Sequence, residues 1–238
     1  MVWASTTEPE VGSGGAGGMA GGALSRPRSP TGSPAEQPRP VRDMERIELI
    51  PDGPRLSRLV YGAWRLEEDP AGSAPERVLA KIDRCLELGI TSFDHADIYG
   101  GYRCEQRFGA ALAERPGLRD SIELVTKCDI CPMSEARPAH RVTHYDASPG
   151  HIQSSVETSL HNLGTDRVDV LLLHRPDPLM DADETAAALT GLVDSGKVLH
   201  LGVSNFTPSQ FELLQSRLER PLVTNQIELS VLHLEPLV

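Results

Sequence analysis

The sequence predicts a parallel α/β fold, in which strands and helices alternate along the chain. From residue 58 onward, six apolar, strand-like segments alternate with segments whose apolar residues have helical spacing. The segment 167–177, RVDVLLLHRPD, is apolar over most of its length, as in a parallel strand that helices cover on both faces. Two architectures share this alternation, an open doubly wound sheet and a (β/α)8 barrel.

The first 43 residues differ in composition from the rest of the chain and are rich in Gly, Ser, Pro and Ala. Such a segment has too little apolar surface to offset the entropy cost of ordering, so residues 1–43 are predicted to be a disordered extension. A G-x-G-x-x-G match begins at Gly12, but no strand precedes it and no helix follows, so it is not interpreted as a dinucleotide loop. Met44 begins the predicted folded part, 44–238, and is a candidate translation start.

Within this part the elements follow from apolar spacing and from start and stop signals. Strands are expected at 44–51, 58–64, 90–100, 121–128, 167–177, 197–206 and 221–230. Helices are expected at 74–89, 105–114, 148–164, 183–197 and 207–218. Gly89 and Gly164 are stop signals, and Thr207 is an expected N-cap followed by Pro208. The long connection 129–147 is expected to overhang a pocket.

The composition excludes several classes of partner. Lys and Arg number 23 against 34 Asp and Glu, a net charge of −11, which disfavours nucleic acid and anionic membranes as partners. No apolar run reaches the roughly 18 residues of a membrane span. The four cysteines are too few and too irregular for a disulfide framework, and no secretory signal is evident. A reducing, cytoplasmic location is therefore predicted.

Polar side chains stand at the ends of five successive apolar strands. They are Asp94 and Tyr99, Lys127, His174, Ser204 with Asn205, and Asn225 with Gln226. In a parallel barrel the carboxyl ends of all strands open on one face, so these groups would converge on one pocket. An open sheet gathers residues from fewer strands, at its switch point. The barrel is therefore favoured.

The residue types in this set suit proton delivery to a carbonyl oxygen. A tyrosine has a pKa of about 10, which a neighbouring lysine ammonium lowers. A carboxylate such as Asp94 can hold Lys127 charged in a partly dry pocket, and a histidine can donate a hydrogen bond that orients the carbonyl. The carbon would then receive a hydride from a nicotinamide cofactor. Short polar side chains suit the nicotinamide carboxamide, namely Ser204, Asn205 and Gln226.

Five motifs in this order resemble the signatures of the aldo-keto reductases, which are NADP(H)-dependent (β/α)8-barrel enzymes. The motifs are FDHADIYGG, LVTKC, LLLHRPDP, GVSNF and TNQIE, and the similarity runs from about residue 45 to the end. DHADIYGGY and LLLHRPDPLMDADE resemble most closely a bacterial branch of predicted oxidoreductases. The resemblance implies that Tyr99 is the general acid, Lys127 tunes it, Asp94 pairs with the lysine and His174 orients a small-molecule carbonyl substrate. It also implies that Ser204, Asn205 and Gln226 hold the nicotinamide.

Other polar residues near these motifs receive structural interpretations. His95 is expected to shape the pocket rather than react, Tyr102 to form a pocket wall, and Asp97 to be a loop residue. Cys128 and Cys131 form a lone C-x-x-C without a second pair, so no metal site is predicted and two unpaired thiols are expected. The histidines of the following loop and helix start are interpreted as surface residues, namely His140, His144 and His151.

The predicted strands fall short of a whole barrel. Such a barrel has eight strands and about 250 residues, whereas Met44–Val238 holds about 195 residues and six barrel strands. We therefore expect an incomplete barrel that exposes backbone edges and apolar interior and binds NADPH weakly. Two alternatives stay open, a truncated, non-catalytic relative (regulatory, interacting or inactive) and an enzyme that uses Lys127 as a Schiff-base amine. Substrate identity and oligomeric state are not predicted.

Overall fold

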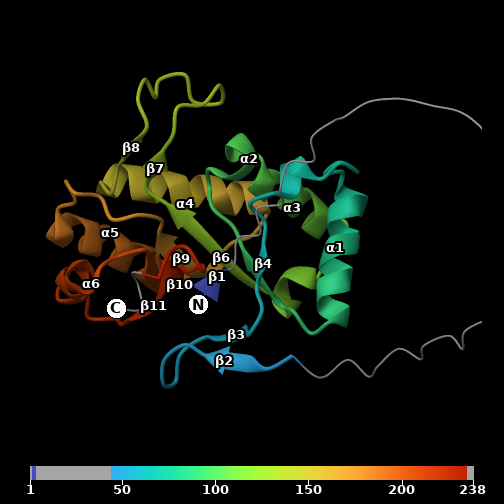
Figure 1. Cartoon of the computed structure of the whole chain (residues 1–238), viewed down its shortest axis with the longest axis horizontal. Coiled ribbons are helices and arrows are strands. Elements are labelled where there is room, and N and C mark those ends of the chain that lie inside the picture. Colours follow the sequence, from blue (N-terminus) through green and yellow to red (C-terminus); the bar gives the residue numbers. More distant parts are fainter. Residues whose placement is uncertain (1, 4–43, 235–238) are drawn as a thin grey trace, which may run out of the picture.

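Parallel strands form the centre of the molecule (Figure 1), in a computed structural model that describes residues 2–3 and 44–234. The sheet has the order β1-β11-β10-β9-β6-β5-β4, and every neighbouring pair is parallel. Its strands are β1 (Val2–Trp3), β4 (Tyr61–Gly62), β5 (Ser92–Asp94), β6 (Glu123–Cys128), β9 (Val168–Leu173), β10 (Val198–Ser204) and β11 (Leu222–Glu228). From β4 to β11 the strands lie side by side in chain order, as in a barrel, so the prediction of six consecutive barrel strands is confirmed.

The predicted extension 1–43 lies outside the described residues, apart from Val2 and Trp3. These two residues form β1, which pairs with β11 through Ile227 and Glu228. The prediction of disorder for the remainder is not tested by the structure.

Helices between successive strands cover the outer face of the curled sheet (Figure 1). They are α1 (Pro75–Glu87), α3 (Cys104–Ala113), α4 (Pro149–Leu163), α5 (Ala182–Asp194) and α6 (Pro208–Gln215), with short turns η1 (Leu66–Glu68), α2 (Tyr99–Tyr102) and η2 (Leu118–Ser121). The capping predictions are confirmed. Thr207 forms a capping box with Gln210, and Gly164 ends α4 in the left-handed conformation at φ 64°. None of the helices described is both long and apolar enough to span a lipid bilayer.

The apolar core lies between the sheet and these helices. Phe93 on β5 contacts Phe108 on α3, with ring centroids 5.2 Å apart, and both are fully buried. Gly109 lets α3 approach α4 closely, because a Cβ there would overlap the carbonyl oxygen of Asn162. The phenylalanine pair thus packs α3 against β5, and the glycine lets α3 pack against α4.

The segment 44–51 is a strand, as predicted, but it lies outside the parallel sheet. β2 (Arg46–Glu48) pairs antiparallel with β3 (Arg55–Ser57) in a separate hairpin. All three residues of β2 are exposed, which explains why it does not enter the buried sheet.

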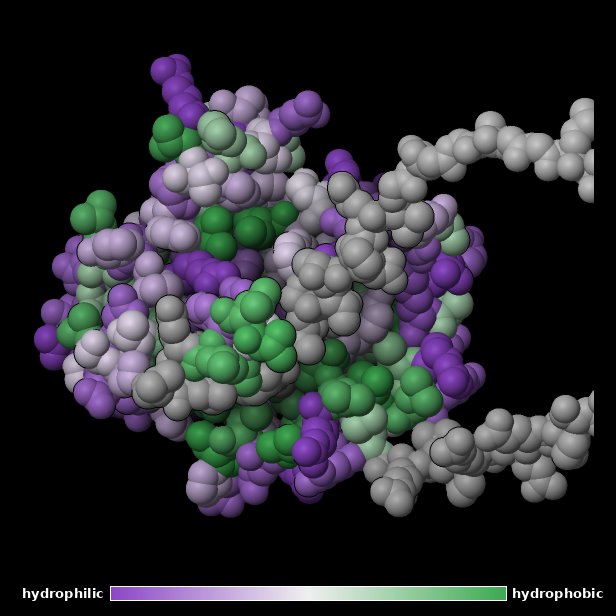
Figure 2. All heavy atoms as spheres, in the orientation of Figure 1, coloured by the Kyte–Doolittle hydropathy of each residue, from purple (hydrophilic) through white to green (hydrophobic). Residues whose placement is uncertain are grey.

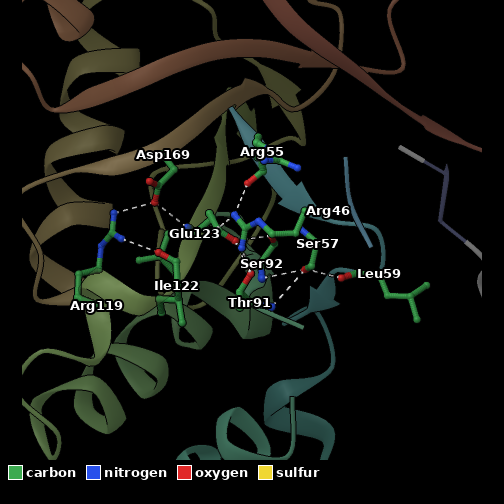
Figure 3. A network of polar contacts seen from close by, with 11 residues as sticks. Arg46, Arg55, Ser57, Leu59, Thr91, Ser92, Arg119, Ile122, Glu123 and Asp169 are labelled. Carbon is green, nitrogen blue, oxygen red and sulfur yellow. Dashed lines mark hydrogen bonds and ion pairs between the residues drawn. The ribbon is translucent and has the colours of Figure 1, made fainter. Parts of the chain in front are cut away.

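This hairpin is attached to the amino ends of the sheet strands through polar contacts (Figure 3). Arg46 donates to Thr91 Oγ1 at 2.8 Å and forms an ion pair with Glu123 at 2.6 Å. Ser57 Oγ accepts the backbone N–H groups of Thr91 and Ser92 at 3.2 and 3.1 Å. The amino end of the sheet is therefore held by structural polar groups, and its carboxyl end is left for other roles.

The connection 129–147 forms a second hairpin at the opposite end of the strands (Figure 1). Its strands are β7 (Ile130–Cys131) and β8 (His144–Tyr145), paired antiparallel. The hairpin projects from the carboxyl end of β6 and leads into α4.

One face of the molecule leaves apolar side chains uncovered. Val231 is 89% exposed and Leu232 95%, just after β11. Figure 2 shows apolar residues gathered on the face over β11 and beside β3. Val231 and Leu232 lie in a turn after the last strand, whereas Val125, Val170, Leu172 and Val223 form a second buried cluster on the sheet. The expected exposure of the barrel interior is therefore not seen among the described residues.

Candidate active site

Lys127 is the centre of a buried polar cluster at the carboxyl end of the sheet. It lies on β6, is 2% exposed, and its Nζ donates to Asp94 Oδ2 at 2.6 Å. The same ammonium donates to the carbonyl of His95 at 2.8 Å and to Tyr99 Oη at 3.1 Å. Strands β5 and β6 are parallel neighbours, so the ends of both strands bring these side chains together.

The charge on Lys127 is stabilised by its partners. Burial opposes the charge, but Asp94 and Tyr99 raise the pKa of Lys127 above its ordinary value. Burial raises the pKa of Asp94, an effect that the ion pair with Lys127 opposes. The geometry therefore holds a protonated lysine in contact with the phenol.

Three residues with left-handed backbone conformation directly follow Tyr99. Gly100, Gly101 and Tyr102 have φ angles of 59°, 63° and 70°. Glycine adopts this region without strain, and Gly100 is also in close contact, because a Cβ there would lie 2.8 Å from Glu67 Cγ. The sharp turn after Tyr99 keeps the phenol beside the lysine.

The acidity of Tyr99 differs from the simple expectation. Burial raises its pKa above the ordinary value, and the lowering by Lys127 only partly offsets this. In this state the phenol is protonated at neutral pH. Lys127 lowers the pKa of Tyr99, as expected, but burial raises it by more.

His174 follows β9 and faces Tyr99 across the cluster. The two rings meet edge-on, with centroids 5.8 Å apart, and His174 is 9% exposed. Burial, with the charges of Lys127 and Arg175, lowers the pKa of His174 to about 2. The imidazole is therefore neutral and carries one N–H, which can donate to a polar ligand.

The ends of β10 and β11 hold three polar side chains in a connected row. Ser204 Oγ donates to the carbonyl of Gln226 at 3.0 Å and accepts from Asn205 Nδ2 at 3.1 Å. Gln226 Nε2 donates to Asp94 Oδ1 at 3.3 Å, which joins the row to the lysine cluster. Asn225 is instead engaged by the backbone of Phe206. The structure thus brings all seven predicted site residues to one end of the sheet.

Two neighbours of the cluster were not predicted as site residues. The His95 ring turns away and packs edge-on against Phe108 at 4.5 Å, but its backbone carbonyl accepts from Lys127. Trp64, 57% exposed, lies beside Tyr99 with ring centroids 6.4 Å apart. Trp64 lies two residues after β4, and this position near the end of the first parallel strand was the available signal.

Asp97 and Tyr102 lie on the helix side of the sheet, away from the lysine. Asp97 accepts a hydrogen bond from Ser155 on α4 at 2.7 Å, and burial raises its pKa to about 7. Both residues line a cavity of about 600 Å³ bounded by α3, α4 and the β7–β8 hairpin. Asp97 lies in the turn between β5 and α2, as predicted for a loop residue, but it is buried, at 8% exposure.

Comparison with known proteins identifies the family. The sequence model of the aldo/keto reductase family matches residues 58–237. The chain belongs to this family. It is 56% identical over 189 residues to the 6-dehydroglucose reductase of Agrobacterium fabrum, covering 79% of this chain. It is 51% identical over 195 residues to the oxidoreductase YdhF of Escherichia coli, covering 82% of this chain.

Solved structures of aldo-keto reductases share the fold. A crystal structure of a thermostable aldo-keto reductase, Tm1743, has a TM-score of 0.67 at 28% identity, covering 81% of this chain and 65% of that one. The glycerol dehydrogenase AKR11B4 of Gluconobacter oxydans has a TM-score of 0.67 at 30% identity, covering 82% and 58%. The chain spans 63% of the Agrobacterium relative and 64% of the Escherichia relative.

Proposed function

We propose that the protein reduces aldehyde or ketone carbonyls to alcohols with NADP(H). The observation that carries this proposal is the contact of one buried ammonium with both a carboxylate and a phenol. Lys127 Nζ lies 2.6 Å from Asp94 and 3.1 Å from Tyr99. The family supports an oxidoreductase that acts on carbonyls.

In the proposed mechanism Tyr99 donates its proton to the carbonyl oxygen. The phenolate left behind is stabilised by Lys127, whose charge is worth more in a buried site than in water. Asp94 keeps the lysine protonated throughout, so the phenolate can form although the phenol has a raised pKa in the unliganded protein. Neutral His174 donates a hydrogen bond that orients the carbonyl.

The row of Ser204, Asn205 and Gln226 suits the nicotinamide of the proposed cofactor. A carboxamide both donates and accepts hydrogen bonds, and hydroxyl and amide side chains do the same. Their mutual hydrogen bonds fix them beside Asp94, so they are ordered before a ligand arrives. When bound, the cofactor supplies a hydride to the carbonyl carbon. The preference for NADP(H) over NAD(H) rests on the family resemblance.

The similar proteins point to a sugar-type carbonyl as substrate. The Agrobacterium relative, and a second at 36% identity from Novosphingobium aromaticivorans, are both named 6-dehydroglucose reductase. We propose a hydroxylated aldehyde of this class as the substrate to test beside a reactive aromatic aldehyde.

The test follows the loss of NADPH absorbance with a nitro-substituted benzaldehyde and with a hydroxylated aldehyde. Wild type should turn over, and Tyr99→Phe should lose at least about 100-fold in kcat, because general acid catalysis contributes about that much or more. Tyr145→Phe, at an exposed phenol on β8, is the matched control and should keep full activity. NADH in place of NADPH measures the cofactor preference.

A different result would favour the alternative role. If folded wild type and Tyr99→Phe are equally inactive with all carbonyls and both cofactors, the reductase proposal fails for this chain. A non-catalytic, interacting or regulatory role would then be the better description.

A further inference from the structure

Three side chains of metal-ligand type meet outside the lysine cluster. Cys131 is on β7, Asp146 directly follows β8, and His151 lies in the first turn of α4. One ligand atom from each lies within 4.8 Å of the others. Cys131 Sγ is 3.8 Å from His151 Nε2 and 3.9 Å from Nδ1. The residues come from three separate elements, so the hairpin and the helix create the cluster.

The distance between Cys131 Sγ and the His151 ring nitrogens is close to that between two ligand atoms of a tetrahedral zinc site. Bonds of about 2.3 Å to sulfur and about 2.0–2.1 Å to nitrogen place the two ligand atoms about 3.6 Å apart. The observed separation exceeds this by a few tenths of an ångström. Because the sulfur is nearly equally far from both ring nitrogens, the half-buried His151 ring must turn to aim one of them at the ion. Thiolate, imidazole and carboxylate together favour Zn²⁺ over Mg²⁺ or Ca²⁺, which prefer oxygen ligands.

Ser148 contacts the Asp146 carboxylate and caps the helix that carries His151. The backbone N–H of Ser148 donates to Asp146 Oδ1 at 2.9 Å, and Ser148 Oγ accepts the N–H of His151 at 3.4 Å. The N–H of Asp146 donates to the carbonyl of Asp129 at 2.8 Å. The first of these bonds fixes a ligand carboxylate, as in metal sites, and the other two fix the backbone that carries Asp146 and His151.

Three acidic side chains lie near the Cys131 thiol, and burial raises the pKa of two of them, Asp97 and Asp129. Burial, together with the nearby Asp146, Asp97 and Asp129, raises the pKa of the Cys131 thiol to about 11. Asp97 and Asp129 are themselves buried, at 8% and 0% exposure. Positive groups are also close, since Arg137, His140 and His144 act on His151 together with Asp146. A bound dication would favour the ionised forms of these carboxyl groups and of the Cys131 thiol.

The cavity of about 600 Å³ gives this cluster an access route. Its lining includes His151 together with Asp97, Tyr102, Arg137 and His140. A cation can therefore reach the imidazole without passing through the lysine cluster on the other side of the sheet.

We propose that Cys131, Asp146 and His151 bind one Zn²⁺ ion, with a fourth position for water or for a polar ligand that enters through the cavity. The ion joins the β7–β8 hairpin to α4 and so fixes the loop at the rim of the sheet. This site is independent of the proposed reductase activity, and its test does not require turnover.

The test uses Co²⁺ as a spectroscopic probe on the untagged full chain. We expect one Co²⁺ per chain and a thiolate-to-cobalt absorption band, which Zn²⁺ removes by displacement and excess Mg²⁺ does not. Cys131→Ser should lose the band, and His151→Gln and Asp146→Asn should weaken Co²⁺ binding at least about tenfold. Cys128→Ser, the other thiol of the C-x-x-C, and His144→Gln are matched controls that should keep the band.

Several results would overturn the proposal. They are the absence of a stoichiometric thiolate band in wild type, a band retained in Cys131→Ser, or binding unchanged in His151→Gln. Displacement by Mg²⁺ would also contradict it, because it would indicate an oxygen-ligand site. Circular dichroism checks that each variant folds. If the buried Cys131→Ser variant does not, the half-buried His151→Gln decides, together with the EDTA-reversible rise in wild-type melting temperature expected with Zn²⁺.

Discussion

Asp94 and Asp97 lie three residues apart on the same connection, and both are buried, yet their surroundings differ in kind. Asp94 faces the lysine cluster and forms an ion pair with Lys127 at 2.6 Å. Asp97 faces α4, accepts from the Ser155 hydroxyl and forms no ion pair among the described residues. Burial penalises both charges, but only Asp94 has a cation in contact. The pair shows how one short segment can hold a carboxyl group in contact with a cation on one side and, on the other, one whose pKa burial raises to about 7.

Removing the cation should give the largest effect. Lys127→Met leaves Asp94 buried without its partner, so the free energy of unfolding should fall by about 3–5 kcal/mol, as measured by urea denaturation. Lys197→Met breaks the exposed pair with Glu157 and should change it by less than about 1 kcal/mol. The double variant Asp94→Asn/Lys127→Met should recover part of the loss. Equal losses in the free energy of unfolding for Lys127→Met and Lys197→Met would contradict the expected difference between a buried and an exposed ion pair.

Neutralising Asp97 should change how stability depends on pH. Its pKa rises from 3.8 to about 7 on folding, so the folded chain binds a proton that the unfolded chain releases. The free energy of unfolding of wild type should therefore fall between pH 4 and about 7, by up to about 4 kcal/mol at about 1.4 kcal/mol per pKa unit. Asp97→Asn lacks this contribution. The free energy of unfolding of wild type should therefore fall relative to that of Asp97→Asn as the pH rises over this window.

The measurement for Asp97 is urea denaturation at several pH values in matched salt. Asp166→Asn, at an exposed carboxylate, controls for the loss of one charge. A wild-type minus Asp97→Asn difference that stays flat from pH 4 to 8 would show that Asp97 is ionised in the folded protein.

A larger side chain between α3 and α4 should lower the free energy of unfolding, because the two helices are in close contact at Gly109. Gly109→Ala introduces a Cβ where the Asn162 carbonyl already lies, so we expect a loss of about 1–3 kcal/mol in thermal or urea unfolding. Gly191→Ala is the matched control in α5, where a Cβ meets no neighbour, and should stabilise by about 0.5–1 kcal/mol. Similar results for the two variants would argue against the close approach of α3 and α4.

The smallest expected effect comes from Ser155→Ala. The hydroxyl donates to Asp97 and favours its charged form, so its removal should raise the pKa of Asp97 further. Stability should fall by about 1 kcal/mol above pH 8 and by less below pH 6, where Asp97 is protonated. Thermal unfolding at both pH values measures this, and a loss of the same size at both would place the role of Ser155 in packing alone.

The lysine cluster could be anticipated from the sequence because parallel strands place their carboxyl ends together. Asp94, Lys127 and His174 each stand at such an end, so strand assignment was enough to bring them together. The fold class followed from the same alternation. The net rise in the pKa of Tyr99 could not be anticipated, because it depends on how deeply the phenol is buried.

The hairpins and the helix side were harder to predict. The segment 44–51 was predicted as a strand, but its hairpin partner was not, although the turn signal Pro51-Asp52-Gly53-Pro54 was present and Asp52 is left-handed at φ 57°. The meeting of Cys131, Asp146 and His151 depends on hairpin pairing and on the start of α4. The spacing of these three residues in the sequence is irregular, so it did not indicate that their side chains would meet.

The ammonium of Lys127 has three hydrogens, and three acceptors surround it: a carboxylate, a backbone carbonyl and the phenol oxygen. This saturation gives the contact with Tyr99 a direction. The phenol oxygen receives a hydrogen from the lysine, so its own hydrogen must point elsewhere, toward whatever molecule occupies the space beside it. The same saturation disfavours an imine-forming role for Lys127, since a nucleophilic nitrogen would first have to shed a proton and abandon one of these acceptors.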